Sequence, residues 1–197
     1  VEGETVWDRV QSQKTIGLSD AIAIIQQMCS ALDQVHQRRI VHRDVKPSNI
    51  MLDEKHGRAV LFDFGLAHDL DGPRPPEGRV FGSPMFLAPE QALGNSVDGR
   101  TDLYGLGVTL YRLVVGAVPF YGERNELLHA HVKLSPPDPR DAGVADDLSE
   151  IVLRAMSKDP ELRFQSGADF AAALATVETP PASVRKRGLL RRIAGPS

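Results

Sequence analysis

The 197-residue chain has the composition of an ordinary globular protein, with 42% hydrophobic residues, 25% charged residues and a formal net charge of -3. These values exclude a mostly disordered chain and a globally basic protein that coats nucleic acid, and the length allows one good core but not two comfortable domains. The single cysteine, Cys29, excludes an internal disulfide framework and fits a reducing compartment. Because the first ten residues lack the basic-then-apolar pattern of a secretory signal, we expect a cytoplasmic location.

Charge is distributed unevenly along the chain. All 26 acidic residues lie within residues 1–179, whereas residues 180–197 contain five basic residues and no acidic one. The tandem prolines Pro180 and Pro181 favour extended chain, so we place a domain boundary there, between a domain at 1–179 and a basic tail at 180–197. The tail is either a solvated, disordered terminus or a juxtamembrane segment attracted to anionic headgroups on the cytoplasmic side of a membrane. It is too short and too charged to cross a bilayer.

The first half of the chain predicts one long helix followed by a hairpin. Apolar residues recur every three or four positions across 19–37, which predicts an amphipathic helix with Ser19 as its cap and Cys29 on its core-facing side. Two short apolar runs at 50–52 and 59–62 are joined by a turn-like sequence and predict a β-hairpin. A stretch rich in glycine and proline at 69–84 predicts a long irregular loop.

The second half is predicted to be mostly helical. Residues 103–121 form the most hydrophobic window, which invites a transmembrane interpretation, but Arg112, two glycines and Pro119 interrupt it. A buried core helix is the better interpretation. Helical patterns return at 123–133, at 148–158 and at 167–177, the last with Ser166 as a plausible cap.

The densest polar cluster runs from His42 to Asn49, between the long helix and the hairpin, and Asp63 follows the second strand. Phosphoryl transfer requires a carboxylate that orients the attacking hydroxyl, oxygen ligands for Mg²⁺ and cations beside the transferred charge. Asp44 can be the base and Lys46 the cationic donor, while Asn49 and Asp63 offer oxygen ligands for magnesium. Singly these residues mean little, but together they predict phosphoryl transfer.

The motifs HRDVKPSN, DFG and APE (residues 42–49, 63–65 and 88–90) resemble the eukaryotic-type serine/threonine protein kinases, in particular their bacterial members. The resemblance covers about residues 1–177. It implies an α+β, mainly helical fold: a protein-kinase-like C-terminal lobe with a short β-hairpin after the catalytic loop. It also implies transfer of the γ-phosphate of ATP, with Mg²⁺, to serine or threonine hydroxyls of a protein substrate, and makes Lys46, Asn49, Met51 and Asp63 the nucleotide- and metal-binding residues.

The resemblance implies further roles. Met51 would form the floor of the adenine pocket, although it can equally be a strand residue that fills the core. Asp102 would anchor the backbone of the catalytic loop. Glu90 would pair with Arg163 and tie the end of the activation segment to the helical lobe. Ser83 occupies the place of a hydroxyl that contacts both the catalytic aspartate and the catalytic-loop lysine.

The activation segment departs from the family pattern. Between Gly65 and Ser83 the chain contains no serine, threonine or tyrosine, so phosphorylation of that stretch on a hydroxyl is chemically impossible. Arg43 is the residue that usually pairs with such a phosphate. Our hypothesis is that an acidic residue, Glu77 or Asp71, takes the place of the phosphate, the alternative being that Arg43 has no partner.

The N-terminal half of the family's active site is not evident. A glycine-rich loop and a strand lysine would require a lobe of roughly 65 residues, whereas 18 residues precede Ser19 and contain no G-x-G-x-x-G motif. We expect a hinge near residues 1–4, and negligible transfer by the 197 residues alone. Two rival functions stay open: a non-catalytic module that docks partners or substrates, and a small-molecule kinase, which the peptide-platform-like GSPMFLAPE disfavours.

Two weaker patterns give little support for a metal site or for nucleic-acid binding. His129 and His131 are two residues apart on a predicted helix and therefore point to different faces, which disfavours a metal site. The basic tail has no interleaved aromatic residues, so we expect no nucleic-acid partner.

Overall fold

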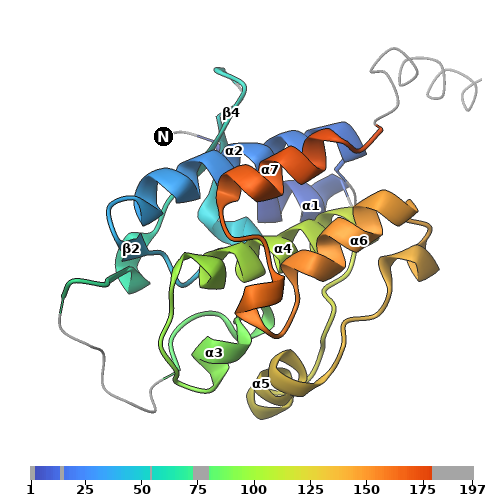
Figure 1. Ribbon diagram of the computed structural model, residues 1–197. Coiled ribbons are helices and arrows are strands. Elements are labelled where there is room, and N and C mark those ends of the chain that lie inside the picture. Colours follow the sequence, from blue (N-terminus) through green and yellow to red (C-terminus); the bar gives the residue numbers. More distant parts are fainter. Residues whose placement is uncertain (1–2, 14–15, 54, 73–79, 179–197) are drawn as a thin grey trace, which may run out of the picture.

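The computed structural model describes residues 3–13, 16–53, 55–72 and 80–178, which form a mainly helical fold with two small antiparallel sheets (Figure 1). The described helices are α1 (Val6–Gln13), α2 (Leu18–His36), α3 (Pro89–Ala92), α4 (Gly99–Val115), α5 (Arg124–Lys133), α6 (Asp146–Ala155) and α7 (Gly167–Ala175). The strands are β1 (Glu4–Thr5), β2 (Ile40–Val41), β3 (Ile50–Asp53), β4 (Arg58–Leu61) and β5 (His68–Asp69). The predicted basic tail at 180–197 lies outside the described residues.

The helices α2, α4, α6 and α7 surround the main core. Helix α2 packs against both α7 and α4, and α4 packs against α6, as Figure 1 shows. Gly107 of α4 is essential to this packing, because a Cβ atom at that position would lie 2.7 Å from the Cβ of Ala155 on α6. The two helices can therefore approach closely only where α4 has no side chain.

Helix α2 confirms the predicted long amphipathic helix but begins one residue earlier. Gly17, in extended conformation, is its N-cap and offers no side-chain hydrogen bond, so the prediction that Ser19 caps the helix was wrong. Ser19 lies one residue inside the first turn, where its backbone is already helical. Cys29 is fully buried on the core side, as predicted, and burial, reinforced by the nearby charge of Asp33, raises the pKa of its thiol to about 12.

Helix α4 is the buried helix that the hydrophobic window predicted, but its bounds differ from 103–121. It begins at Gly99, because the Asp98 carboxylate accepts a hydrogen bond from the Arg100 amide and caps the first turn. It ends at Val115, because Gly116 adopts a left-handed conformation with φ 84°. No helix among the described residues is long and apolar enough to span a membrane.

The predicted hairpin is formed by β3 and β4, which pair antiparallel with Ile50 opposite Leu61. Strand β1 adds to the edge of β3, and α1 follows directly. The sequence pattern predicts only a hinge near residues 1–4 and not α1, whose buried Val6 and Val10 join the core.

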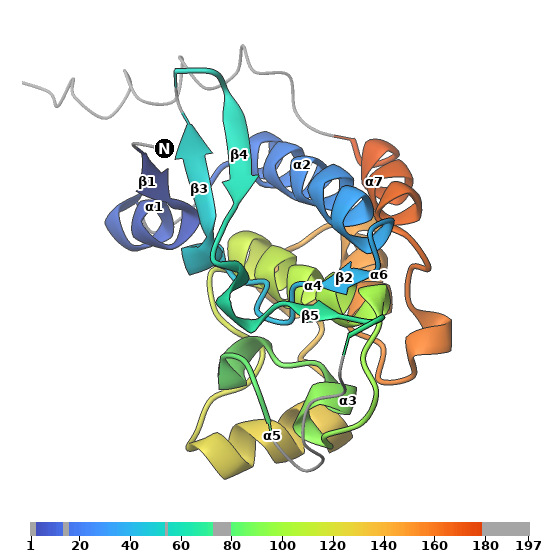
Figure 2. The same cartoon turned by 90° about the vertical axis from the view of Figure 1, so that its left-hand side faces the viewer.

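Helices α5, α6 and α7 agree with the predicted helices to within a few residues. The predicted cap of α7 is also present, since the Ser166 hydroxyl accepts from the Asp169 amide at 3.0 Å. Figure 2 shows the hairpin at one end of the molecule, α3 and α5 at the other, and the pair β2–β5 between them. The polar cluster at 42–49 connects β2 to β3 and therefore lies at the middle of the molecule.

Candidate active site

The loop between β2 and β3 is held by a carboxylate of the buried helix α4. Asp102 accepts hydrogen bonds at 2.8 Å from the backbone amides of His42 and Arg43, one on each oxygen. Its Oδ2 also lies 2.8 Å from Nε2 of His36, at the end of α2. Two helices and the loop are thus joined at one fully buried side chain, and Arg43 is held in a left-handed conformation with φ 65°. This is the anchoring contact that the resemblance implied for Asp102.

His42 connects this loop to the segment that follows β4. Its Nδ1 accepts from the Asp44 amide at 3.3 Å, and its Nε2 lies 3.0 Å from the Phe62 carbonyl oxygen. A carbonyl can only accept, so Nε2 carries the proton and the imidazole is in one defined tautomer. The ring also packs edge-to-face against Phe64, with centroids 4.7 Å apart. The position of His42 in the polar cluster did not by itself predict this connecting role.

Asp44, Lys46 and Ser83 form a connected polar triad. The Lys46 ammonium donates to Asp44 Oδ2 at 2.7 Å and to the Ser83 hydroxyl at 2.6 Å. The Ser83 amide donates to Asp44 Oδ1 at 2.9 Å. Burial by itself would raise the pKa of Asp44, but the hydrogen bonds from Lys46 and Ser83 and the Lys46 charge outweigh it and lower the pKa below its usual value. Asp44 is therefore an anion at neutral pH, held against a cation.

Asn49 and Asp63 are brought close together by the hairpin. The Asn49 side chain donates through Nδ2 to the Asp44 carbonyl at 2.9 Å and to Asp44 Oδ2 at 3.1 Å, so its amide oxygen is the atom left for a cation. Its backbone carbonyl accepts from the Phe62 amide at 3.0 Å, immediately before Asp63. Asp63 adopts a left-handed conformation with φ 61° and ψ 68°, which is unusual for a residue other than glycine and is typical of functional sites.

The chemistry of these two side chains fits magnesium. They supply one amide oxygen and one carboxylate, and Mg²⁺ is commonly bound by one or two such protein ligands together with substrate phosphates. Within the described residues, no group of three or more His, Cys, Asp or Glu side chains is placed to hold a metal ion. One amide oxygen and one carboxylate leave most coordination positions of Mg²⁺ for a phosphorylated ligand and water.

Met51 lies on β3, opposite Thr5 of β1 and Val60 of β4. Its side chain is half-buried, so it is not simply a core residue. A Cβ atom at Gly3 would lie 3.1 Å from Met51 Cγ, so the N-terminal strand passes directly beside it. Met51 takes no part in the hydrogen-bonded cluster around Asp44, and neither does the Asp63 carboxylate, which accepts from the Gly65 amide.

Glu90 and Arg163 form a bidentate, buried ion pair. The two guanidinium nitrogens Nη1 and Nη2 each donate to a separate oxygen of Glu90 at 2.8 Å. Thr101 donates to the same carboxylate at 2.8 Å. The pairing implied by the resemblance is present, and it ties α3 to the chain between α6 and α7 across 73 positions of sequence.

The hypothesis of an acidic partner for Arg43 does not hold for Asp71. The Asp71 carboxylate instead accepts from Arg39 at 2.7 Å, because both residues flank the β2–β5 pair and lie at the surface. Glu77 lies outside the described residues. Arg43 donates through Nε to the Leu66 carbonyl at 2.6 Å, and its guanidinium lies 5.1 Å from the centre of the Phe81 ring.

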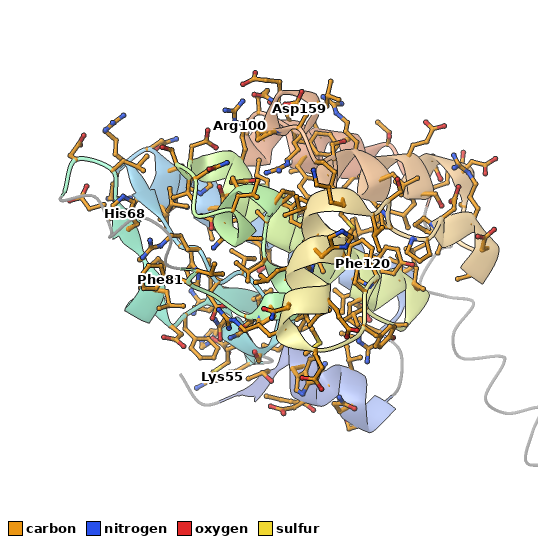
Figure 3. The ribbon with its side chains drawn as sticks, turned by 90° about the horizontal axis from the view of Figure 1, so that it is seen from below. Lys55, His68, Phe81, Arg100, Phe120 and Asp159 are labelled. Atoms are coloured by element: carbon orange, nitrogen blue, oxygen red, sulfur yellow. The ribbon has the colours of Figure 1, made fainter. Side chains whose placement is uncertain are left out.

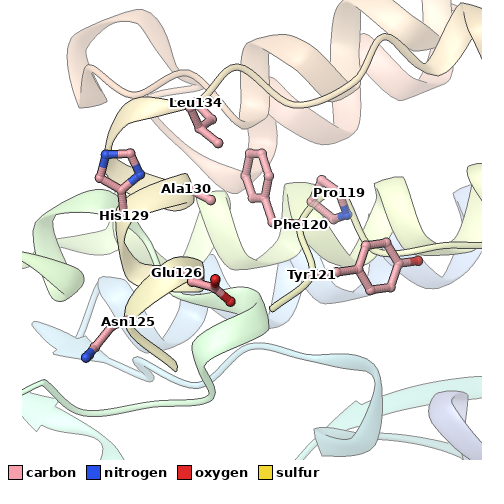
Figure 4. A pocket seen from close by; sticks show the side chains of 8 residues that line it. All are labelled: Pro119, Phe120, Tyr121, Asn125, Glu126, His129, Ala130 and Leu134. Atoms are coloured by element: carbon pink, nitrogen blue, oxygen red, sulfur yellow. The ribbon is translucent and has the colours of Figure 1, made fainter. Parts of the chain in front are cut away.

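The two histidines of α5 have different surroundings. His131 is fully buried, with Nδ1 2.9 Å from the Tyr104 hydroxyl. His129 instead lines a surface hollow of about 570 Å³, together with residues such as Phe120 and Leu134 (Figure 4). They therefore point to different sides of α5, as their two-residue spacing indicated. The hollow lies between α5 and the chain before it, apart from the polar cluster.

Comparison with known proteins agrees with this geometry. The family model of the protein kinase domain matches residues 1–174, and the chain belongs to that family. The serine/threonine-protein kinase PknB of Mycobacterium leprae is 39% identical over 184 residues, covering 91% of this chain and 29% of the relative. PknB of Mycobacterium tuberculosis is 39% identical over 183 residues, with 90% and 29% covered. The serine/threonine-protein kinase Pkn1 of Myxococcus xanthus is 43% identical over 161 residues, with 78% and 23% covered.

The family membership confirms the expected fold class, a mainly helical protein-kinase-like domain with a small sheet. The family as a whole implies ATP, a divalent metal ion and protein substrates. The chain spans less than a third of the length of these curated relatives.

Proposed function

We propose that this chain contributes the catalytic loop, the magnesium ligands and the substrate-docking segment of a serine/threonine protein kinase. The observation that carries the proposal is the Asp44–Lys46–Ser83 triad, which holds a carboxylate as an anion and keeps a cation within hydrogen-bonding distance of it. Neither the carboxylate nor the cation by itself implies phosphoryl transfer. A fixed acceptor and a fixed cation at one point are what positions a hydroxyl and stabilises a transferring phosphoryl group.

Asp44 would orient the hydroxyl of the protein substrate. A carboxylate has about four acceptor sites, two on each oxygen. Oδ2 accepts from Lys46 and Asn49, whereas Oδ1 accepts from the Ser83 amide. The remaining acceptor site is therefore on Oδ1, which would receive the hydroxyl proton. Because the pKa of Asp44 is lowered, the carboxylate is an orienting acceptor throughout and takes the proton late, as a loose transition state requires.

Lys46 would donate to the transferring group. An ammonium has three N–H donors, and the described contacts use two of them, to Asp44 and to Ser83. The third is left for an oxygen of the phosphoryl group. Ser83 contacts both Lys46 and Asp44 and would therefore keep the two side chains at fixed positions relative to each other.

Asn49 and Asp63 would hold Mg²⁺, which neutralises charge on the phosphates of ATP when it is bound. Asn49 is buried and is braced by its two bonds to Asp44, so its oxygen is preorganised. Asp63 is exposed and bonds only to the Gly65 amide at 3.3 Å among the contacts described. Its carboxylate is therefore accessible to a ligand. Met51, half-buried on β3, would lie under the adenine ring.

Substitution of Asp63 tests the proposal in the full-length protein. We expect Asp63→Ala to abolish Mg-ATP-dependent transfer to a protein substrate, with circular dichroism and melting temperature unchanged, because the side chain makes a single weak hydrogen bond. Asp71→Ala is the matched control: it also removes an exposed aspartate of the same segment, but one that pairs with Arg39, and it should retain transfer. Undiminished transfer by Asp63→Ala would disprove the assignment of Asp63 as a magnesium ligand, whereas absence of transfer by the wild-type full-length protein would favour a non-catalytic docking module.

A further inference from the structure

Before Ser83, the activation segment has no hydroxyl side chain that could carry a phosphate and so order the segment. No serine, threonine or tyrosine lies between Gly65 and Ser83, and Asp71 is engaged with Arg39. Yet Ser83, at the end of this segment, is held within hydrogen-bonding distance of both Asp44 and Lys46. Contacts among the described residues hold the chain before Ser83 against the catalytic loop without a phosphate.

Gln91 of α3 supplies such a contact. Its Nε2 donates to the Arg43 carbonyl at 2.8 Å and to the Phe81 carbonyl at 3.3 Å. Its Oε1 accepts from the Ala88 amide at 3.2 Å, which fixes the direction of the side-chain amide. Gln91 is buried, so each of these bonds satisfies a group that water cannot reach easily. One side chain thus joins the catalytic loop, the activation segment and α3.

Arg43 holds both ends of the same segment. Its Nε donates to the Leu66 carbonyl at 2.6 Å, near the beginning of the segment, while its guanidinium lies over the Phe81 ring near the end. A cation over an aromatic face is attracted by the ring quadrupole, more strongly when both are shielded from water. Figure 3 shows Phe81 on the face seen from below, the end of the molecule that carries α5. The Phe81 ring thus supplies a partner for Arg43 that carries no charge.

The backbone at Gly82 is adapted to this close contact. Its φ is +111°, and a Cβ atom there would lie 2.9 Å from the Arg43 carbonyl oxygen. Only glycine combines this conformation with so close an approach. From the other side, Arg124 of α5 donates to the Val80 carbonyl at 3.3 Å. The chain at 80–83 is therefore held from the catalytic loop, from α3 and from α5.

We propose that Gln91 is a positioning residue and, with the Arg43–Phe81 contact, forms a clasp that docks residues 80–83, the end of the activation segment, on the catalytic loop without a phosphate. In the kinase proposed above, on which this part of the inference rests, the clasp keeps Ser83 against Asp44 and Lys46 at all times. The enzyme is then competent without phosphorylation of this segment, and its activity is controlled elsewhere.

The test uses two variants of the full-length protein and a readout that needs no activity. Gln91→Glu is isosteric and keeps the acceptor for Ala88 but removes both donors. Phe81→Leu keeps the backbone carbonyl and removes the ring, and it keeps the proposal testable if the first variant does not fold. Gln26→Leu is the control, because Gln26 also donates from a part-buried position to a carbonyl at 3.3 Å but lies on α2, facing α7.

The measurement is hydrogen exchange of the Ser83 amide, which donates to Asp44 in the docked state. We expect at least about ten-fold faster exchange in Gln91→Glu and Phe81→Leu, and no change in Gln26→Leu. Unchanged exchange in both clasp variants would overturn the proposal.

Kinase assays separate this inference from the proposed function. We expect the clasp variants to lose protein-substrate kcat/KM while the KM for ATP stays the same, a split that general destabilisation does not produce. If the wild-type protein shows no transfer but the Ser83 exchange responds as expected, the proposed function fails and the clasp stands. If transfer is normal and the exchange does not respond, the clasp fails and the proposed function stands.

Discussion

Substitution of Arg163 by methionine should be among the most damaging single changes away from the catalytic loop. All five N–H donors of this guanidinium are used. Two go to Glu90, and the others go to the carbonyls of Ser157, Arg100 and Lys158 at 2.7–3.1 Å. Arg163 is 1% exposed, so methionine fills a similar volume but leaves these partners without a donor.

The size of the stability loss follows from the buried acceptors that lose their donor. Glu90 would keep only the Thr101 hydroxyl as a donor among its described contacts, at a position where its side chain is 11% exposed. Removing one partner of a buried, hydrogen-bonded ion pair typically costs about 3–5 kcal/mol, because the remaining charge is uncompensated. Total stabilities are about 5–15 kcal/mol. We therefore expect Arg163→Met to remove about a fifth or more of the free energy of unfolding.

Urea denaturation of the full-length protein, followed by circular dichroism, measures this loss. Arg140→Met is the matched control: Arg140 also donates to three carboxylates, of Asp138, Asp146 and Glu150, but it lies at the surface. Exposed ion pairs contribute little, so the control should lose far less stability. A loss in Arg163→Met no larger than that of Arg140→Met would refute the reasoning. A Glu90→Gln, Arg163→Met double variant should lose less than the sum of the single losses.

Two further predictions concern the core. Burial, followed by the charge of Lys158, lowers the pKa of His131 from 6.5 to about 4, so between these pH values the unfolded chain binds more protons than the folded one. The contribution of neutral His131 to the free energy of unfolding is fully present above about pH 6.5, and roughly 3 kcal/mol of it is lost as the pH falls towards 4. Urea midpoints at pH 7 and pH 4.5 should therefore differ less in His131→Gln than in the wild type, and an equal difference in both would contradict the prediction. Gly107→Ala would normally favour a helix, but its new methyl group would collide with Ala155 on α6, so we expect a loss of about 1–3 kcal/mol. Thermal melting measures this loss of stability, and a melting temperature equal to or above that of the wild type would show that α4 and α6 can separate without cost.

Much of the fold and of the candidate site follows from local sequence signals. The three-to-four-residue spacing of apolar residues predicts α2, and Ser166 marks the start of α7, because helical periodicity and capping are properties of neighbouring residues. The polar cluster that contains Asp44 is likewise continuous in sequence. Two features were not predicted correctly. The beginning of α2 was wrong because Gly17, in extended conformation, is the cap directly before the first helical position, and α1, which has only 8 residues, was not predicted.

The order of residues in the chain by itself determined the family, the core helices and the residue types of the site. Only the tertiary structure decided which polar groups are partners. Asp71 pairs with Arg39 and not with Arg43, and Gln91 bonds to the Arg43 carbonyl 48 positions away, because the fold brings these segments together. A buried donor or acceptor must find a partner wherever the fold provides one, so such pairings depend on packing and burial and not on any pattern of neighbouring residues.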